Sequence, residues 1–296
     1  MRVVVTGREG QVACALLAAG MMRDCEIVAL GRPQLDLAAD RQSVYKALAS
    51  ALPDVIVSAA AYTAVDRAES EPAQAFAVNA TGAEAVALSA ASLGVPLIHL
   101  STDYVFDGAK GEPYVEVDVT EPRTVYGASK LAGEQLVLAA HRDCVILRPA
   151  WVFSPFGTNF VRTMLRLAGD RDTIGVVDDQ FGSPTSASDL AEAILAIASR
   201  LRTCSDPELR GIFHLTNTGS ASWADLAKTI FTVSQRAGGP EAAVRAISTS
   251  DYPTAAPRPA NSRLNCGLVF DRFGISLRPW QYAVDAVVGQ LVGSTV

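Results

Sequence analysis

The feature that most constrains the fold is a regular alternation of apolar strands and helical stretches through about residue 150. Each expected strand is a short, continuous apolar run, which is typical of a parallel sheet buried on both faces. The expected strands are Val3–Val5, Glu26–Leu30, Asp54–Ser58, Val95–Leu100 and Cys144–Arg148, and the expected helices are Gln11–Ala19, Arg41–Leu52, Ala73–Leu93 and one beginning at Tyr126. The pattern predicts an α/β fold with a doubly wound parallel sheet of the Rossmann type.

A glycine-rich turn follows the first expected strand. Gly7 and Gly10 fill the first two small positions of a dinucleotide-binding fingerprint, and Ala13 fills the third. The first glycine permits a tight bend, the second lets the backbone approach a pyrophosphate, and the third small residue allows close helix–strand packing. The following helix offers free amides to phosphates. We therefore expect Gly7, Gly10, Gln11 and Val12 to bind a dinucleotide.

The regular alternation weakens after Pro149. We expect residues 1–150 to form a dinucleotide-binding domain and residues 151–296 to form mainly a smaller substrate-binding lobe. Segments of about 174–217 are expected to return to the first sheet. The proline-rich stretch from Ser248 to Asn265 is expected to be an extended loop.

The residues after the second and third strands bear on the choice of cofactor. The acid that would bind a ribose 2′-hydroxyl is absent after the second strand, where Arg32 stands instead. An arginine can neutralise a 2′-phosphate, so NADPH is expected, with NADH as the alternative cofactor; equally, Arg32 could be a solvated loop residue. Asp36 and Leu37 are expected near the adenine. The small residues Ala59, Ala60 and Ala61 would let a cofactor lie close, although a buried strand end explains them almost as well.

Composition excludes several classes of protein. The net charge of −6 argues against nucleic acid or an anionic membrane as the main partner. The first strand is expected to begin at Arg2, so no signal peptide is expected, and no apolar run is expected to span a membrane. The five cysteines lack a Cys-x-x-Cys spacing and indicate a reduced, cytoplasmic protein. No metal site is expected.

Tyr126 and Lys130 form the strongest chemical signal. On a helix, positions four apart share one face, so a phenol and an ammonium could reach the same reacting group. A neighbouring cation favours the phenolate, so Lys130 is expected to lower the pKa of Tyr126 and make it a usable proton donor. The alternative is an ordinary exposed helix pair. Thr102 follows the fourth strand, whose carboxyl end should face the same crevice.

Four motifs add to these features. In this sequence they are Ala59–Glu69, Ser101–Phe106, Asp179–Thr185 and Arg258–Leu264. With the glycine turn and the Tyr126–Lys130 pair, they make the chain resemble the extended short-chain dehydrogenase/reductases nearly end to end. The last two motifs resemble the members that act on dTDP-linked 4-keto-6-deoxy sugars. The resemblance implies NADPH-dependent reduction of the C4 ketone of dTDP-4-dehydro-β-L-rhamnose to dTDP-L-rhamnose.

The resemblance also implies residue roles. Thr102, Tyr126 and Lys130 would form the catalytic set. Tyr126 would protonate the developing alkoxide at C4, Lys130 would bind the nicotinamide ribose, and Thr102 would position the carbonyl. By the same resemblance, Thr63 would lie beside the cofactor, as would Tyr126 and Lys130. The residues near the sugar would be Thr63, Val65, Thr102, Asp103 and Tyr126.

Two further residues are candidates for substrate binding. Trp151 could pack on the sugar or on thymine, with core packing as the alternative. Arg258 could bind the diphosphate through its guanidinium, with an exposed loop arginine as the alternative. The nearby carboxylates of Asp66, Glu69 and Glu71 are expected to be a solvated helix start rather than a metal site.

The sequence leaves alternatives for the oligomeric state and for the exact substrate. Relatives that dimerise through magnesium use glutamates in the first helix and the C-terminal half, where this chain has Cys14-Ala15-Leu16 and Gln281. We therefore expect a monomer or a metal-independent homodimer. The alternatives to the favoured function are a reductase of another dTDP-4-keto-6-deoxy sugar and a non-catalytic, cofactor-binding regulatory subunit.

Overall fold

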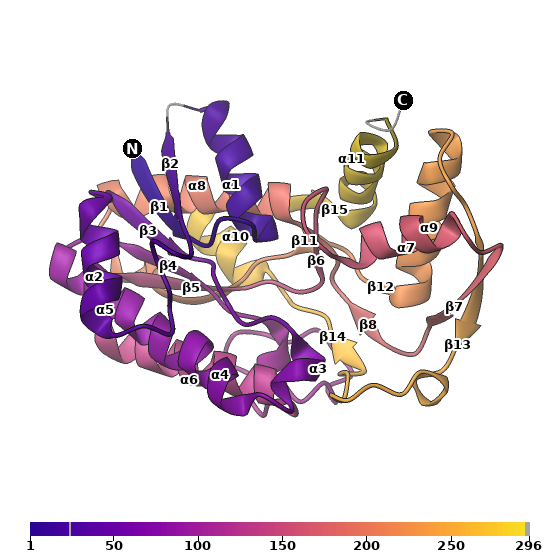
Figure 1. Cartoon of the computed structure of the whole chain (residues 1–296), viewed down its shortest axis with the longest axis horizontal. Helices are drawn as coiled ribbons and strands as arrows, with labels where there is room; N and C mark the ends of the chain where they lie inside the picture. The colour runs from indigo at the N-terminus through magenta and orange to yellow at the C-terminus, as the bar shows by residue number, and fades with distance from the viewer. Residues whose placement is uncertain (24, 294–296) are drawn as a thin grey trace.

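The main element of the structure is a six-stranded sheet in the order β10-β5-β4-β3-β1-β2, with every neighbouring pair parallel (Figure 1). The computed structural model describes residues 1–23 and 25–293. The strands are β1 (Arg2–Thr6), β2 (Glu26–Leu30), β3 (Val55–Ser58), β4 (Leu97–Leu100), β5 (Cys144–Arg148) and β10 (Gly211–His214). This topology confirms the predicted doubly wound α/β fold.

Helices cover both faces of this sheet. Along β1, Val3 and Val5 pack on one face against α1 (Gln11–Met21) and α8 (Ala187–Thr203), with α10 (Gly267–Phe273) beside them. Val4 points to the opposite face and packs against α2 (Arg41–Ser50) and α5 (Ala83–Leu93), with α6 (Val125–Ala140) next to α5. Both faces of the strands are therefore core, which explains their continuous apolar sequences.

The helical stretch before β4 contains an irregular turn. It runs through α4 (Pro72–Phe76), a π-helical turn (Ala77–Gly82) and α5. Asn79 lies in this turn and bonds the backbone of Tyr62 twice, accepting from its N–H at 2.7 Å and donating to its C=O at 3.0 Å. Contrary to the expectation that no run could span a membrane, Pro72–Leu93 is long and apolar enough by composition, but half of its apolar window is buried inside the protein.

A second group of elements packs around a separate core (Figure 1, at the right). Its helices are α7 (Phe160–Ala168), α9 (Trp223–Arg236) and α11 (Trp280–Gly293), and its longest strands are β7 (Thr173–Val177) and β13 (Ala243–Ile247). The remaining elements are the short helix α3 (Val65–Ala68) and the strands β6 (Val152–Phe153), β8 (Phe181–Gly182), β9 (Thr185–Ser186), β11 (Asn217–Thr218), β12 (Ala221–Ser222), β14 (Asn261–Ser262) and β15 (Leu277–Pro279).

Segments from the second half of the chain are shared between the two groups. β10 pairs with β5, and α8 packs on α1. By contrast, β7 also falls within 174–217 but pairs with β13 in the second group. The stretch 248–265, expected to be a loop, contains β14, which pairs with β8. We retain the division into a dinucleotide-binding lobe (1–150, with α8 and β10) and a substrate-binding lobe as a proposal.

Candidate active site

The glycine turn lies between β1 and α1, at the carboxyl end of the sheet. Gly7 has φ +96°, in the region that favours glycine, and its N–H bonds the Leu30 carbonyl at 2.6 Å. Gly10 is the N-cap of α1, and a side chain built there would meet no described atom within 4 Å. The space above Gly10 and the start of α1 is therefore open to a phosphate group.

Small residues after β3 lie against this turn. The Thr6 hydroxyl oxygen accepts hydrogen bonds from the N–H groups of Ala59 and Ala60, both at 3.0 Å. Ala60 also packs on Gly7, because a Cβ at Gly7 would lie 3.5 Å from the Ala60 Cβ. Ala61 follows at the surface of the same crevice and is half-buried. The predicted cofactor residues on β1 and β3 are thus brought together.

Two arginines lie at the end of β2. Arg32 is exposed, and so is Arg8, which sits inside the glycine turn. The stem of Arg8 covers Gly31, and its Nη1 donates to the Gln34 side chain at 3.3 Å. Arg8 was not singled out in the sequence, although an arginine between the two glycines was the available signal.

The remaining predicted cofactor residues make mainly structural contacts. The Asp36 carboxylate accepts a hydrogen bond from the Ala38 N–H at 2.9 Å, which closes a local turn. Leu37 and Val12 are buried in the core. Any contact of Leu37 or Val12 with a cofactor would therefore be made by the backbone.

Helix α6 brings Tyr126 and Lys130 to the end of β4. Its N-terminus is fixed by Thr124, whose hydroxyl oxygen accepts from the Gly127 N–H at 3.0 Å. Tyr126 is 8% exposed and Lys130 is 2% exposed, while Thr102, directly after β4, is 5% exposed. The alternative of an ordinary exposed helix pair is therefore wrong.

Lys130 is held from the side of β4. Its Nζ donates to the Leu100 carbonyl at 2.6 Å and lies 3.4 Å from Nε2 of His99. An ammonium only donates, so Nε2 accepts and Nδ1–H of His99 donates to the Ser58 hydroxyl, 3.1 Å away. Burial and the charge of Lys130 both lower the pKa of His99, which keeps the ring neutral. His99 and Ser58 were not identified from the sequence.

Burial dominates the protonation states at this centre. It raises the pKa of Tyr126 to about 12, against the lowering effect of a hydrogen bond with Thr102, and the charge of Asp103 raises it further. It lowers the pKa of Lys130 to about 8, against the raising effect of Glu134. The expectation that Lys130 lowers the pKa of Tyr126 is wrong for this structure, because desolvation of the phenol raises that pKa and the charge of Lys130 is not among the causes that shift it.

Asp103 stands beside Thr102 at the same strand end. Its Oδ1 accepts from the Thr102 hydroxyl at 3.0 Å, and Oδ2 has no hydrogen-bond partner in the described part of the chain. Burial raises the pKa of this carboxyl to about 6. The Ser262 side chain is close enough to lower this pKa in part, but Oδ2 has no geometric hydrogen bond within the described residues, which fits a site that a ligand hydroxyl would complete.

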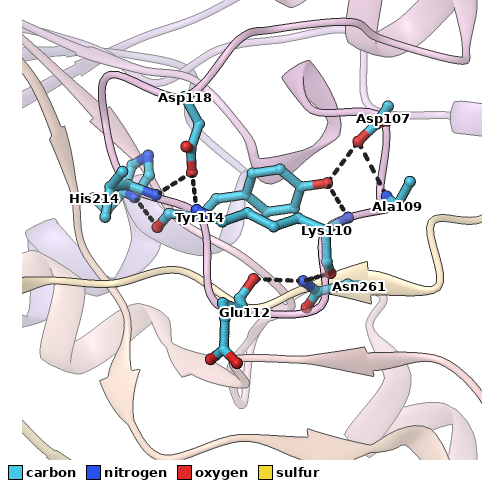
Figure 2. A network of polar contacts seen from close by, with 9 residues as sticks. Asp107, Ala109, Lys110, Glu112, Tyr114, Asp118, His214 and Asn261 are labelled. Atoms are coloured by element: carbon cyan, nitrogen blue, oxygen red, sulfur yellow. Dashed lines mark hydrogen bonds and ion pairs between the residues drawn. The ribbon is translucent and has the colours of Figure 1, made fainter.

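The loop after Phe106 is held in place by residues from distant strands (Figure 2). The Tyr114 hydroxyl donates to Asp107 at 2.6 Å, and Asn261 donates to the carbonyls of Lys110 and Glu112 at 2.6 and 2.9 Å. His214, from β10, lies 3.1 Å from the Tyr114 carbonyl through Nδ1. Asn261 belongs to the Arg258–Leu264 motif, so this motif secures the loop that follows Thr102 and Asp103.

A buried ion pair lies one helical turn beyond Lys130. Arg148 at the end of β5 bonds Glu134 through two nitrogens, at 2.8 and 2.6 Å, and both side chains are 2% exposed. The Arg148 guanidinium also lies 5.1 Å from the centre of the Phe106 ring. These contacts connect α6, β5 and the segment after Thr102.

The candidate substrate residues lie on several elements. Thr63 is exposed, and Val65 is half-buried at the start of α3. The Trp151 indole stacks on Trp223, with ring centres 3.5 Å apart, and occupies the place where a side chain on Gly182 would stand. Part of the Trp151 surface is thus used in packing.

Arg258 is paired rather than free. Its Nη2 donates to Asp66 at 2.6 Å, and its side chain is 22% exposed. Arg258 lines a cavity of about 260 Å³ together with Tyr104, whose ring packs edge-on against Tyr126. This contact places Arg258 in the neighbourhood of the reacting centre.

The acidic cluster lies partly exposed at and after the start of α3, as expected, but its carboxylates also make specific contacts. Asp66 binds Arg258 and the Ala256 N–H, Glu69 accepts from the Val125 N–H at 2.9 Å, and Glu71 accepts from the Tyr62 hydroxyl at 2.6 Å. Each carboxylate therefore has a specific partner. Within residues 1–23 and 25–293, no group of three or more His, Cys, Asp or Glu side chains is arranged to hold a metal ion.

Known proteins resemble this chain over nearly its whole length. Residues 1–292 match the family model described as RmlD substrate binding domain. The chain is 53% identical to a dTDP-4-dehydrorhamnose reductase of Sinorhizobium fredii, covering 99% of this chain and 98% of that protein. It is 40% identical to the Escherichia coli dTDP-4-dehydrorhamnose reductase, covering 100% and 99% of the two chains.

Solved structures agree as well. The Bacillus anthracis dTDP-4-dehydrorhamnose reductase in complex with NADP superimposes with a TM-score of 0.89 at 35% identity, covering 97% of this chain and 98% of that one. The Clostridium acetobutylicum enzyme gives 0.90 at 33% identity, with 98% and 99% covered. The chain belongs to the dTDP-4-dehydrorhamnose reductase family of extended short-chain dehydrogenase/reductases.

Proposed function

We propose that this protein reduces the C4 ketone of dTDP-4-dehydro-β-L-rhamnose to dTDP-L-rhamnose, with NADPH as the hydride donor, in the cytoplasm. The observation that carries the proposal is the burial of Thr102, Tyr126 and Lys130 together at the end of β4, beside an open glycine turn. The relatives at 53% and 40% identity that bear the reductase name support the choice of sugar nucleotide.

The residues present fit a dinucleotide. The open space at Gly10 suits the pyrophosphate, and the small side chains of Ala59–Ala61 leave room beside the turn. Lys130 presents a buried ammonium near the end of β4, where it can bind ribose hydroxyls. When bound, the nicotinamide supplies the hydride for the ketone.

Tyr126 acts as the acid in this mechanism. Its pKa of about 12 keeps the phenol protonated near neutral pH, so the proton is present when the substrate arrives. The alkoxide that develops at C4 is more basic than a phenolate, so the proton passes from the Tyr126 hydroxyl to the sugar oxygen. Thr102 donates a hydrogen bond to that oxygen and orients it, and the Lys130 ammonium stabilises the phenolate that remains.

Preference for NADPH follows from the two arginines at the end of β2. Arg8 and Arg32 are both exposed there, and two guanidiniums can neutralise a 2′-phosphate. We expect Arg8→Ala and Arg32→Ala each to raise KM for NADPH by roughly tenfold, about 1.4 kcal/mol, with little effect on KM for NADH. Steady-state kinetics with both cofactors check this; a wild type that clearly prefers NADH would contradict it.

The function is tested by following NADPH oxidation with dTDP-4-dehydrorhamnose generated in situ by an epimerase. We expect consumption only when the epimerase is present, with dTDP-L-rhamnose as the identified product. Equal consumption without the epimerase would contradict this substrate and indicate a reductase of another dTDP-4-keto-6-deoxy sugar. No consumption, with NADPH still bound, would contradict catalysis and indicate a regulatory subunit.

A further inference from the structure

The side chain of Gln11 joins the two groups of elements. Gln11 is the first residue of α1, so its backbone N–H belongs to the open helix start at the glycine turn. Its side chain points elsewhere: Oε1 accepts from the Ser154 hydroxyl at 2.9 Å and from Asn159 Nδ2 at 3.0 Å, and Nε2 donates to the Val152 carbonyl at 3.3 Å. All three polar contacts go to one segment of the chain.

That segment, residues 151–159, connects β5 to α7 and is called here the crossover segment. It is folded around the Gln11 side chain. Ser154 is fully buried, and Asn159 Nδ2 also donates to the Ser154 carbonyl at 2.8 Å. Gly157 has φ +63°, and a Cβ there would lie 3.7 Å from Cγ of Gln11. Asn159 is in addition the N-cap of α7, so the same side chain starts that helix.

The other end of the crossover segment carries Trp151. Trp151 has φ +47°, an uncommon backbone conformation for a residue with a bulky side chain. Such a conformation persists only where the surrounding structure determines it. Here the indole is held by stacking on Trp223 of α9. The crossover segment is therefore fixed to α9 at Trp151 and to α1 through Gln11.

We propose that Gln11 is a positioning residue that holds the crossover segment, and with it Trp151 and α7, in register with the cofactor site. The proposal rests on the proposed function, with NADPH on the α1 side, and on the expectation from the sequence that Trp151 packs on the sugar nucleotide. The backbone and the side chain of Gln11 would bind different groups. The N–H would bind the phosphate of the cofactor, and the side-chain amide binds the crossover segment.

This division makes the proposal testable. Gln11→Ala removes the side chain and keeps the N–H. We expect it to raise KM for the dTDP-sugar and Kd for dTDP by roughly tenfold each, about 1.4 kcal/mol, as expected from losing neutral hydrogen bonds. The Kd for NADPH and kcat should change by less than about threefold. Titration calorimetry with dTDP and with NADPH, beside steady-state kinetics, separates these quantities.

Ser154→Ala tests the same contact from the opposite side, away from the phosphates, and remains informative if the Gln11 variant fails to fold. Ser154 also bonds the backbone of Phe156, so this variant removes more than the contact with Gln11. It should still raise the dTDP Kd, and the double variant should raise it by less than the two single effects combined, since both variants lose the Gln11–Ser154 hydrogen bond. Gln42→Ala, at an exposed position of α2, is the matched control and should leave every constant unchanged.

An unchanged dTDP Kd in both variants would overturn the proposal. So would an NADPH Kd that rises as much as the dTDP Kd, because the side chain would then act on the cofactor. Failure of the proposed function is distinguishable, since the wild type would then not bind NADPH or not reduce the sugar.

Discussion

Two buried ionisable side chains, those of Tyr126 and Lys130, lie at the end of β4. Burial favours the neutral forms of both Tyr126 and Lys130, so the phenol holds its proton firmly and the ammonium holds its proton weakly. The hydrogen bonds from Lys130 to Leu100 and His99 support the charged form of the lysine. Near neutral pH the phenol is therefore protonated and the lysine is charged, which are the two states that the proposed mechanism requires.

Removing the phenol hydroxyl tests its role directly. Tyr126→Phe is expected to lower kcat by roughly two to four orders of magnitude, because the proton donor is lost while the ring that packs against Tyr104 remains. NADPH affinity, measured by fluorescence titration, should be nearly intact. Tyr282→Phe, at an exposed position on α11, serves as the control. Near-normal turnover of Tyr126→Phe would refute the assignment.

The lysine predicts an alkaline limit to activity. Burial lowers the Lys130 pKa to about 8, so its ammonium is present below that pH and is lost as the pH rises through it. Turnover should therefore be level near neutral pH and fall above about pH 8. Asp103, with a pKa of about 6, titrates below this window. In Lys130→Arg, which stays charged, the decline should disappear even though the rate is lower. A wild-type profile without a fall near pH 8 would be inconsistent with this role.

At the scale of single residues, the sequence predicted which side chains share a helix face better than it predicted how deeply they are buried. The four-residue spacing was enough to bring Tyr126 and Lys130 to one helix face. The burial that sets their pKa values arises from α6 packing on the sheet, which spacing cannot report. His99 and the side-chain contacts of Gln11 depend on residues 31 to 148 positions away in the sequence, so nothing local marked them.

Among the elements, α6 is the one that most determines the site. Two of its glycines are positions of close approach: a Cβ on Gly127 would lie 2.2 Å from the Tyr104 carbonyl oxygen, and one on Gly133 would lie 2.1 Å from that of Asn79. A glycine inside a helix costs about 1 kcal/mol relative to alanine. Here the absence of a side chain at these two glycines lets α6 lie against the π-helical turn and the segment after Thr102.

Gly133→Ala should therefore destabilise the fold by about 1–3 kcal/mol, because the backbone of Asn79 must move to accept the methyl group. The matched control is Gly289→Ala in the interior of α11, where a Cβ would meet no described atom within 4 Å. That variant should be neutral or more stable by about 0.5–1 kcal/mol. Urea unfolding of both variants measures the difference; equal stabilities would contradict the packing argument.

Element boundaries were predictable in proportion to the length of the apolar run. β2 and β5, of five residues each, begin and end where expected, although β5 is buried throughout and β2, at the edge of the sheet, is only half-buried. β8, β9, β12 and β14 have two residues each and carry no periodic signal. The π-helical turn within 72–93 is fixed by the bonds of Asn79 to Tyr62, which the helical pattern did not reveal.

For the whole molecule, the sequence bears on the oligomeric state and on whether it depends on a metal ion. The positions considered for a shared magnesium carry Cys14 on α1 and Gln281 on α11 rather than glutamate. We propose a monomer or a metal-independent homodimer. The mass measured by light scattering should be the same with EDTA and with added magnesium. Dissociation by EDTA that magnesium reverses would contradict this proposal.

The placement of β10 carries a practical consequence. The last strand of the main sheet, beside β5, comes from residues 211–214, well beyond the turn into the second group. A fragment ending at residue 150 would leave the backbone N–H and C=O groups of β5 unpaired at an exposed edge, available for pairing with other copies. The proposed dinucleotide-binding lobe thus cannot be excised by one cut; a minimal version would need α8 and β10 joined back through a designed linker.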